Sequence, residues 1–200
     1  PSLEKWWGMI KSWQKRDCLA FDQSGDIIKP QHAIKRLCDM TGKHDVYVTT
    51  EVGQHQMWAA QYFAFEQPNR WMTSGGLGTM GYGLPSAMGV QVAHPDALVI
   101  DIAGEASFMM NMQELSTLAQ YNLPVKMFII NNEWMGMVRQ WQELIHGGRY
   151  SESYSASLPD FTKLADTFGM TGLMAETVGD LDGVITEMLA TPGPVIADIG

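Results

Sequence analysis

The sequence predicts an α/β fold in which a parallel sheet is covered by helices on both faces. Unbroken apolar segments alternate with segments of helical pattern along the chain, and strands that are apolar throughout are buried on both faces of a sheet. The chain has 200 residues, 46% of them hydrophobic, which is enough to bury one sizeable core. We therefore expect a single domain of this class.

The predicted elements follow this alternation in order. We expect strands at residues 45–50, 97–104, 125–132, 170–177 and 193–199. Helical patterns occupy residues 54–65, 111–121, 136–145, 160–168 and 180–190. Two segments interrupt the alternation, a glycine-rich one at 73–89 and a polar loop at 146–160.

The two ends of the chain do not fit a self-contained domain. Residues 1–16 read as an amphipathic helix that no strand precedes, and the chain stops directly after the strand at 193–199. We expect residues 1–30 to be a helix and linker from a preceding domain. Residues 31–200 would then be a C-terminal domain that is truncated at its own C-terminus.

Charge and cysteine content narrow the possible partners and location. The net charge is -9 and the 13 basic residues are scattered, which argues against a nucleic-acid surface. No apolar run reaches the roughly 20 residues that span a bilayer, and no leader pattern opens the chain. Cys18 and Cys38 are the two cysteines, and two free structural thiols suit a reducing cytoplasm. We expect a cytoplasmic protein that binds neither nucleic acid nor membrane.

Oxygen ligands follow two of the predicted strands at the point where each strand ends. Glu105 lies in a turn of small residues, Gly104 to Ser107, whose backbone suits an anion at the start of a helix. A carboxylate beside a phosphate requires a cation between them, and Mg²⁺ takes carboxylate, amide and phosphate oxygens together. Asn131 and Asn132 follow the next strand. The pair predicts a magnesium-diphosphate site, although each end alone would suit an ordinary helix cap.

The strand at 45–50 leads into a third turn of this kind. Gly53 permits a tight turn, and Gln54 and His55 then begin a helix where they are able to donate to a phosphate. A histidine at this position also suits a simple helix cap, and the sequence leaves both functions open. Glu51 is a candidate general acid or base, but as one exposed acid in a turn it is a weak one.

Two further segments contribute candidate walls of a ligand site. The glycine-rich segment matches neither GxGxxG with a distal acid nor GxxxxGK[ST], which disfavours a Rossmann site and a P-loop. It suits close backbone approach to a ligand or to another chain, with Met80 as an apolar wall. In the helix at 136–145, helical spacing of apolar residues ordinarily indicates a core face. Arg139 and Trp141 are also placed to line a substrate pocket.

These motifs together resemble one enzyme family. "GEAS" followed by "IINN" is similar to the GDG…NN motif of thiamine-diphosphate enzymes. "VGQHQMWAAQ", "SGGLGTMGYGLPSAMG", "MVRQWQEL" and "GGRYS" resemble the catalytic subunit of acetohydroxyacid (acetolactate) synthase. The resemblance covers nearly the whole chain and implies a C-terminal domain that binds thiamine diphosphate. In that family an N-terminal domain contacts the aminopyrimidine ring and a middle domain holds FAD.

The resemblance also implies roles for individual residues. The Mg²⁺ ligands would be Glu105, Asn132 and the carbonyl of Trp134. The residues at thiamine diphosphate would be Gln54, His55, Gly78, Thr79, Met80, Ala106, Ser107, Gly136 and Met137. Trp141 matches the tryptophan that narrows the substrate pocket. No catalytic residue is expected here, because the activating glutamate of the family comes from the N-terminal domain, and Glu51 is not that residue.

The implied reaction belongs to branched-chain amino-acid biosynthesis. Pyruvate is decarboxylated on the cofactor and condensed with a second pyruvate or with 2-oxobutyrate, in a homodimer or tetramer that a regulatory subunit can bind. Two alternatives stay open: another thiamine-diphosphate decarboxylase or oxidase, and a non-catalytic binding or assembly module. One residue departs from the motif, because Glu105 replaces the usual aspartate, and Mg²⁺ tolerates little deviation from octahedral geometry.

Overall fold

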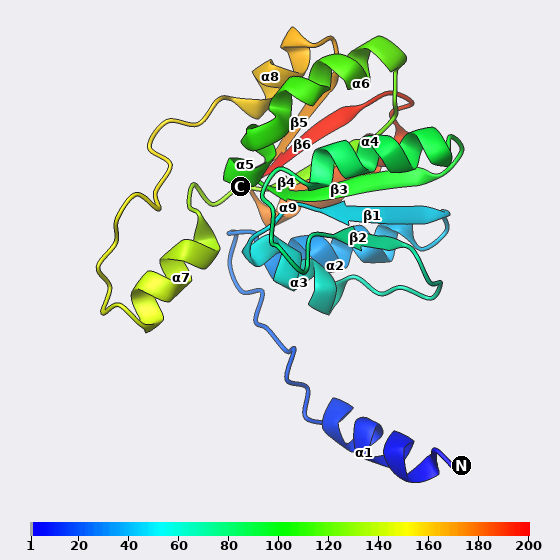
Figure 1. The fold of residues 1–200 in the computed structure, drawn as a ribbon, viewed down its shortest axis with the longest axis vertical. Coiled ribbons are helices and arrows are strands. Elements are labelled where there is room, and N and C mark those ends of the chain that lie inside the picture. The colour runs from blue at the N-terminus through cyan, green and yellow to red at the C-terminus, as the bar shows by residue number, and fades with distance from the viewer. Residues whose placement is uncertain (1) are drawn as a thin grey trace.

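The protein is an α/β sandwich with a six-stranded parallel sheet between two layers of helices (Figure 1). The structure is a computed structural model and describes residues 2–200. The strand order is β2-β1-β3-β4-β6-β5, and every neighbouring pair is parallel. The predicted fold class is therefore confirmed.

Five of the strands match predicted ones and the sixth was not predicted. The strands are β1 (Val46–Thr50), β2 (Trp71–Thr73), β3 (Leu98–Gly104), β4 (Lys126–Ile130), β5 (Thr171–Ala175) and β6 (Val195–Ile199). The residues of β4 and β6 are buried throughout, as the unbroken apolar runs indicated. The missed strand, β2, has only three half-buried residues and lies at an edge of the sheet.

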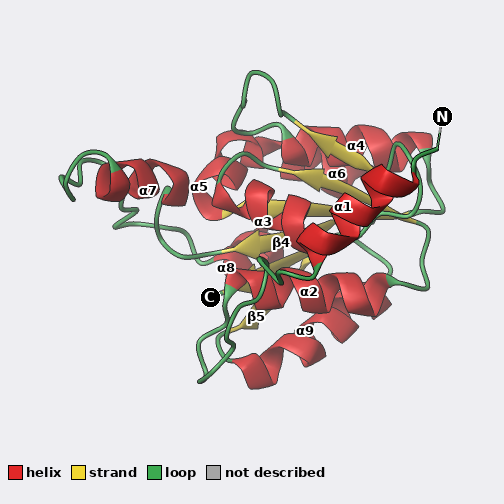
Figure 2. Cartoon of the chain, turned by 90° about the horizontal axis from the view of Figure 1, so that it is seen from below, coloured by secondary structure: helices red, strands yellow, loops and turns green. Residues whose placement is uncertain are grey.

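Each face of the sheet carries its own apolar core. One core lies under α2 (Pro30–Thr41), α3 (Gln54–Tyr62) and α9 (Val178–Ala190). The other lies under α4 (Gly83–Ala93), α5 (Glu105–Phe108), α6 (Leu115–Tyr121) and α8 (Phe161–Thr167). The two helical layers are seen on opposite sides of the strands in Figure 2. The strands are thus shielded on both sides, which leaves their carboxyl ends as the open edge.

Several helices differ from the prediction. The prediction at 111–121 began too late, because α5 starts at Glu105 and continues through a 3-10 helix, η1 (Met109–Glu114), into α6. Both α2 and α4 were not predicted. No helix was predicted in the glycine-rich segment, yet its second half forms α4. There Gly83 packs so closely that a Cβ would lie 2.7 Å from the backbone nitrogen of Glu51, so this glycine serves packing and not a turn.

Two helices lie away from the sheet, at the lower end and at the left of Figure 1. They are α1 (Glu4–Gln14) and α7 (Gly136–Leu144), and neither contains a buried residue. The segment after α1 leads to α2, which begins at Pro30. The domain boundary at residue 30 stays a prediction. Within Ser2–Gly200, no helix has the length and apolar character needed to cross a membrane.

Candidate functional site

A cavity of about 300 Å³ lies at the carboxyl edge of β1, β3 and β4. The strand register brings the ends of β3 and β4 level, since Gly104 pairs with Ile130, and β1 ends close to them, since Thr50 pairs with Ile102. The connections from the strands also lead to opposite sides here, because β2 lies on one side of β1 and β3 lies on the other. Ligands of open α/β sheets bind at such a switch point. The turns selected from the sequence therefore meet at one place.

Most of the predicted site residues line this cavity. Those that do are Gln54, His55, Gly78, Met80, Glu105, Ala106, Ser107, Asn132, Trp134, Gly136, Met137 and Trp141. Thr79 is not among the lining residues, and its backbone nitrogen donates to the Ser74 hydroxyl at 2.9 Å. Gly53 and Gly104, which the sequence placed in the turns at this site, also line the cavity, whereas Val52, Trp58, Ile130, Met135 and Val138 were missed. Helical spacing could have identified Trp58 from the sequence, because it lies one helical turn after Gln54.

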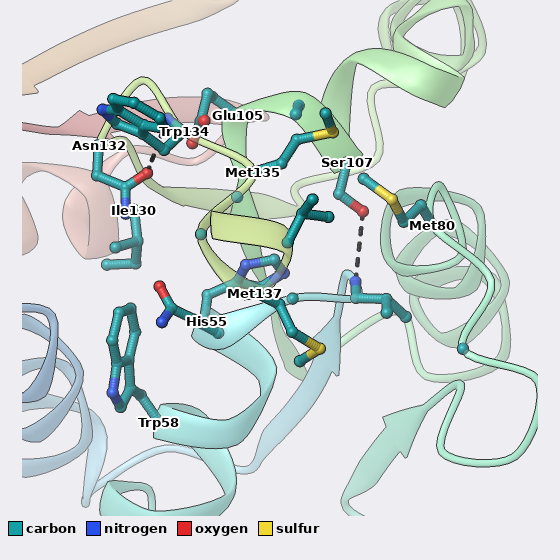
Figure 3. A pocket seen from close by; sticks show the side chains of 18 of the residues that line it. His55, Trp58, Met80, Glu105, Ser107, Ile130, Asn132, Trp134, Met135 and Met137 are labelled. Carbon is teal, nitrogen blue, oxygen red and sulfur yellow. Dashed lines mark hydrogen bonds between the residues drawn. The ribbon is translucent and has the colours of Figure 1, made fainter. Parts of the chain in front are cut away.

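Oxygen atoms gather at one end of the cavity, around Glu105, Asn132 and Trp134 (Figure 3). The Asn132 Oδ1 atom accepts a hydrogen bond from the Trp134 backbone at 3.0 Å. Glu105 is 2% exposed, and its Oε1 atom has no hydrogen-bond partner among the described residues. Burial raises the pKa of Glu105 to about 7. A buried carboxylate oxygen without a partner requires a ligand, and a cation would supply one.

Three helices begin at the cavity. They are α3, whose first residue is Gln54, α5, whose first residue is Glu105, and α7, whose first residue is Gly136. Helix N-termini carry partial positive charge and free N–H groups, so an anion is favoured where they converge. Phosphate oxygens between these helices and a cation at Glu105 would therefore compensate each other.

Glycines keep the backbone close to this convergence. A Cβ at position 104 would lie 2.6 Å from the Nδ1 atom of His55, and a Cβ at Gly53 would lie 2.7 Å from the same ring. His55 is 6% exposed and its Nε2 atom has no hydrogen-bond partner among the described residues. Burial lowers the pKa of His55 to about 4, so the ring is neutral near pH 7. The imidazole is thus held between two glycine backbones with one nitrogen free for a ligand.

Much of the remaining lining of the cavity is apolar. It includes Trp58, Met80, Ile130, Met137 and Trp141. Trp141 is 57% exposed at the outer side. Apolar and aromatic walls of this kind suit the flat rings of a cofactor or substrate. The cavity thus combines an anion-binding part with a ring-binding part.

Helix α7 is fixed at the cavity by polar and aromatic contacts. The Gln54 amide donates to Gln140 Oε1 at 2.9 Å. The guanidinium carbon of Arg139 lies 4.0 Å from the ring centroid of Trp134 and 5.4 Å from that of Tyr150. Arg139 does not line the main cavity, although it lines a neighbouring hollow. Its guanidinium stacks on the tryptophan ring, and its place in a substrate pocket stays a prediction.

Glu51 is buried, so the prediction of an exposed acid was wrong. The Ser107 hydroxyl donates to its Oε2 atom at 2.9 Å, and the backbone nitrogens of Gly81 and Leu84 donate at 2.7 and 3.1 Å. The start of α4 covers it, and a sequence pattern does not reveal that packing. Burial raises the pKa of Glu51 and of its neighbour Asp101. Asp101 accepts one hydrogen bond, from the Thr49 hydroxyl at 2.9 Å.

The residues present fit a magnesium ion held through oxygen atoms of mixed type. Among the described residues, no group of three or more His, Cys, Asp or Glu side chains is arranged to hold a metal. A cation at Glu105 would therefore need amide and carbonyl oxygens from Asn132 and Trp134, together with oxygens of an anionic ligand. Mg²⁺ commonly binds in this way, through one or two carboxylates and substrate phosphates.

Comparison with known proteins places most of the chain in one enzyme family. The family model of the thiamine pyrophosphate enzyme C-terminal TPP-binding domain matches residues 51–199. The chain is 48% identical over 187 residues to the acetolactate synthase isozyme 3 large subunit of Escherichia coli K12, covering 94% of this chain and 32% of that protein. It is 44% identical over 194 residues to the acetolactate synthase large subunit of Haemophilus influenzae, covering 97% and 34%.

A eukaryotic relative gives the same result. The mitochondrial acetolactate synthase catalytic subunit of Saccharomyces cerevisiae is 48% identical over 200 residues, covering 98% of this chain and 29% of that protein. The chain spans about a third of the length of these relatives. The resemblance seen in the motifs is thereby confirmed. Because the family model includes every segment that forms the cavity, the chain belongs to the thiamine pyrophosphate enzymes as their C-terminal TPP-binding domain.

Proposed function

We propose that this chain is the cofactor-binding part of an acetolactate synthase and holds thiamine diphosphate through Mg²⁺. The observation that carries the proposal is the buried Glu105 oxygen beside Asn132, which has no hydrogen-bond partner within residues 2–200, at a cavity where three helices begin. The similarity to acetolactate synthase subunits supports the choice within the family.

The proposed binding mode divides the cavity into two parts. Glu105, Asn132 and the Trp134 carbonyl would hold Mg²⁺. The diphosphate would be bound by Gln54, His55, Ala106, Ser107, Gly136 and Met137. The rings would lie against Gly78 and Met80. Because the Ser107 hydroxyl already donates to Glu51, its backbone N–H is the better donor to the diphosphate.

Thiamine diphosphate would supply carbanion stabilisation for the decarboxylation of a 2-oxo acid. The protein's own contribution is to bind the diphosphate, orient the rings and exclude water with the apolar wall around Met80 and Met137. The proposed substrates are pyruvate and a second pyruvate or 2-oxobutyrate, with Trp141 at the substrate side. We assign no catalytic residue, because the activating glutamate and the FAD site are expected outside these residues.

The remaining parts of the proposal concern the assembly. A homodimer or tetramer, a regulatory subunit and a cytoplasmic location are all expected, the last from the two free thiols. These expectations follow from the family resemblance and from composition. Size-exclusion chromatography with light scattering would test the oligomeric state directly.

Isothermal titration tests cofactor binding. We expect the full-length protein to bind thiamine diphosphate when Mg²⁺ is present, and to lose most of that binding in EDTA. Binding that is indifferent to EDTA would contradict the magnesium site. Binding without turnover would support a non-catalytic module.

Product analysis tests the reaction. Pyruvate should give acetolactate, which chemical decarboxylation converts to acetoin for colorimetric detection. Acetaldehyde or acetyl phosphate as the main product would instead support another decarboxylase or an oxidase.

A further inference from the structure

Glu51 lies just behind the cavity wall and connects three of its segments. It directly follows β1, and its carboxylate is 0% exposed. One oxygen accepts from the Gly81 backbone and the Ser107 hydroxyl, and the other accepts from the Leu84 backbone. A single side chain thus joins the turn after β1, the glycine-rich segment and the turn after β3.

The same carboxylate also caps a helix. The N-cap residue of α4, Tyr82, makes no side-chain capping hydrogen bond. The acceptor for the free N–H of Leu84 comes from Glu51, which is 33 residues earlier in the chain. An ionised carboxylate at a helix N-terminus is favoured by the free N–H groups and by the helix dipole. Three donors therefore stabilise the charge of Glu51 in the interior.

The Ser107 hydroxyl is fully occupied by this arrangement. It donates to Glu51 at 2.9 Å and accepts from the backbone nitrogens of Val52 and Gly81, both at 3.3 Å. The bond from Val52 is drawn in Figure 3. Val52, Ser107 and Met80, the neighbour of Gly81, all line the cavity. The spacing between these walls is consequently set by groups that bind to Glu51.

We infer that Glu51 is a positioning residue for the cofactor, which holds the glycine-rich segment and the Ser107 turn at a fixed spacing across the cavity. The inference rests on the proposed function, because thiamine diphosphate is the ligand whose rings and diphosphate would contact these two walls. Glu51 itself lies behind the wall, so it acts through Ser107 and Gly81 and not by contact with the cofactor.

A pair of matched substitutions tests the inference in the full-length protein. Glu51→Gln keeps the shape of the side chain but places an amide NH₂ among three donors. We expect the affinity for thiamine diphosphate with Mg²⁺, measured by isothermal titration, to fall by about ten- to a hundredfold, the usual effect of hydrogen bonds to a charged group. Thr41→Val is the control, because Thr41 is a buried polar residue whose hydrogen bonds stay within α2, away from the cavity, and its affinity should match that of the wild type.

A double-mutant cycle separates positioning from mere folding. Ser107→Ala removes the hydroxyl that connects the turn to Glu51, and the loss in the double variant should be less than the product of the two single losses. Multiplicative losses would contradict the inference. If Glu51→Gln does not fold, Glu51→Asp carries the test, because it keeps the charge and shortens the side chain by one methylene: lowered cofactor affinity supports positioning, and unchanged affinity overturns it.

The remaining outcomes are also decisive. If Glu51→Gln lowers the Tm but binds the cofactor as the wild type does, Glu51 is only structural and the inference is overturned. If the wild-type protein itself does not bind thiamine diphosphate, the proposed function fails and takes the inference with it. If the wild type binds the cofactor and Glu51→Gln binds it with the same affinity, the inference fails but the proposed function stands.

Discussion

Gly136 and Gln54 lie so close that a Cβ at position 136 would overlap the Oε1 atom of Gln54. The two residues are the first of α7 and of α3, so the contact fixes the spacing of two helix N-termini at the cavity. Gly136 is therefore required for close approach and not for an unusual backbone angle.

Gly136→Ala should weaken cofactor binding without weakening the fold. The Gln54 side chain is flexible and would rotate away, losing its 2.9 Å bond to Gln140 and entering the diphosphate end of the cavity. We expect about a tenfold loss in affinity for thiamine diphosphate, the value of one hydrogen bond. Isothermal titration measures it. The control is Gly183→Ala in α9, where a Cβ meets nothing within 4 Å; equal affinities of the two variants would contradict the role of Gly136.

Gly83→Ala should destabilise the protein. Its Cβ would lie 2.7 Å from the Glu51 backbone nitrogen and 2.8 Å from the Thr50 carbonyl carbon, which are backbone atoms at the end of β1 and cannot rotate away. Overpacking of this kind costs about 1–3 kcal/mol. Thermal unfolding should show a lower Tm. Gly89→Ala in the same helix has nothing within 4 Å of its Cβ and should keep or raise the Tm, so a similar loss in both variants would count against this explanation.

Lys126 should make the free energy of unfolding depend on pH in the alkaline range. Its amine donates to the carbonyls of Thr191 and Gly193 at 2.6 and 2.5 Å, and burial lowers its pKa to about 8 from 10.5. Between these two values the unfolded chain binds more protons than the folded protein, so the free energy of unfolding rises with pH across this window. Thermal unfolding from pH 7.5 to 10.5 should show less of this rise in Lys126→Met. Lys43→Met, at an exposed lysine, is the control, and an identical pH dependence of all three proteins would contradict the prediction.

The sequence allowed the sheet and the oxygen-lined end of the cavity to be predicted because both depend on local patterns. Apolar runs identified β1, β3 and β4, and the parallel arrangement then required Glu105 and Asn132 to meet at one edge. Helix α4 was missed because glycines normally indicate turns, whereas Gly83 serves close packing against β1.

Side-chain environment was the part that local patterns did not determine. Glu51 directly follows a strand in the sequence, as an exposed turn residue often does, and only the packing of α4 against it reveals its burial. Arg139 has the right helical spacing for the cavity, but its guanidinium stacks on Trp134 outside the main lining. Both outcomes depend on contacts between segments that are distant in sequence or on a choice between two sides of one helix.

Glu105→Gln should weaken cofactor binding and stabilise the cofactor-free protein. The glutamine keeps the shape of the side chain and removes a buried carboxylate whose Oε1 atom has no partner among the described residues, so the Tm without cofactor should rise. The same change removes the charge that would hold Mg²⁺, so affinity for thiamine diphosphate with Mg²⁺ should fall by about a hundredfold. Glu105→Asp restores the usual acid of the motif one methylene shorter and should retain Mg²⁺-dependent binding. Thermal unfolding and isothermal titration on the three proteins measure both effects; a glutamine variant that binds as tightly as the wild type would remove Glu105 from the magnesium site.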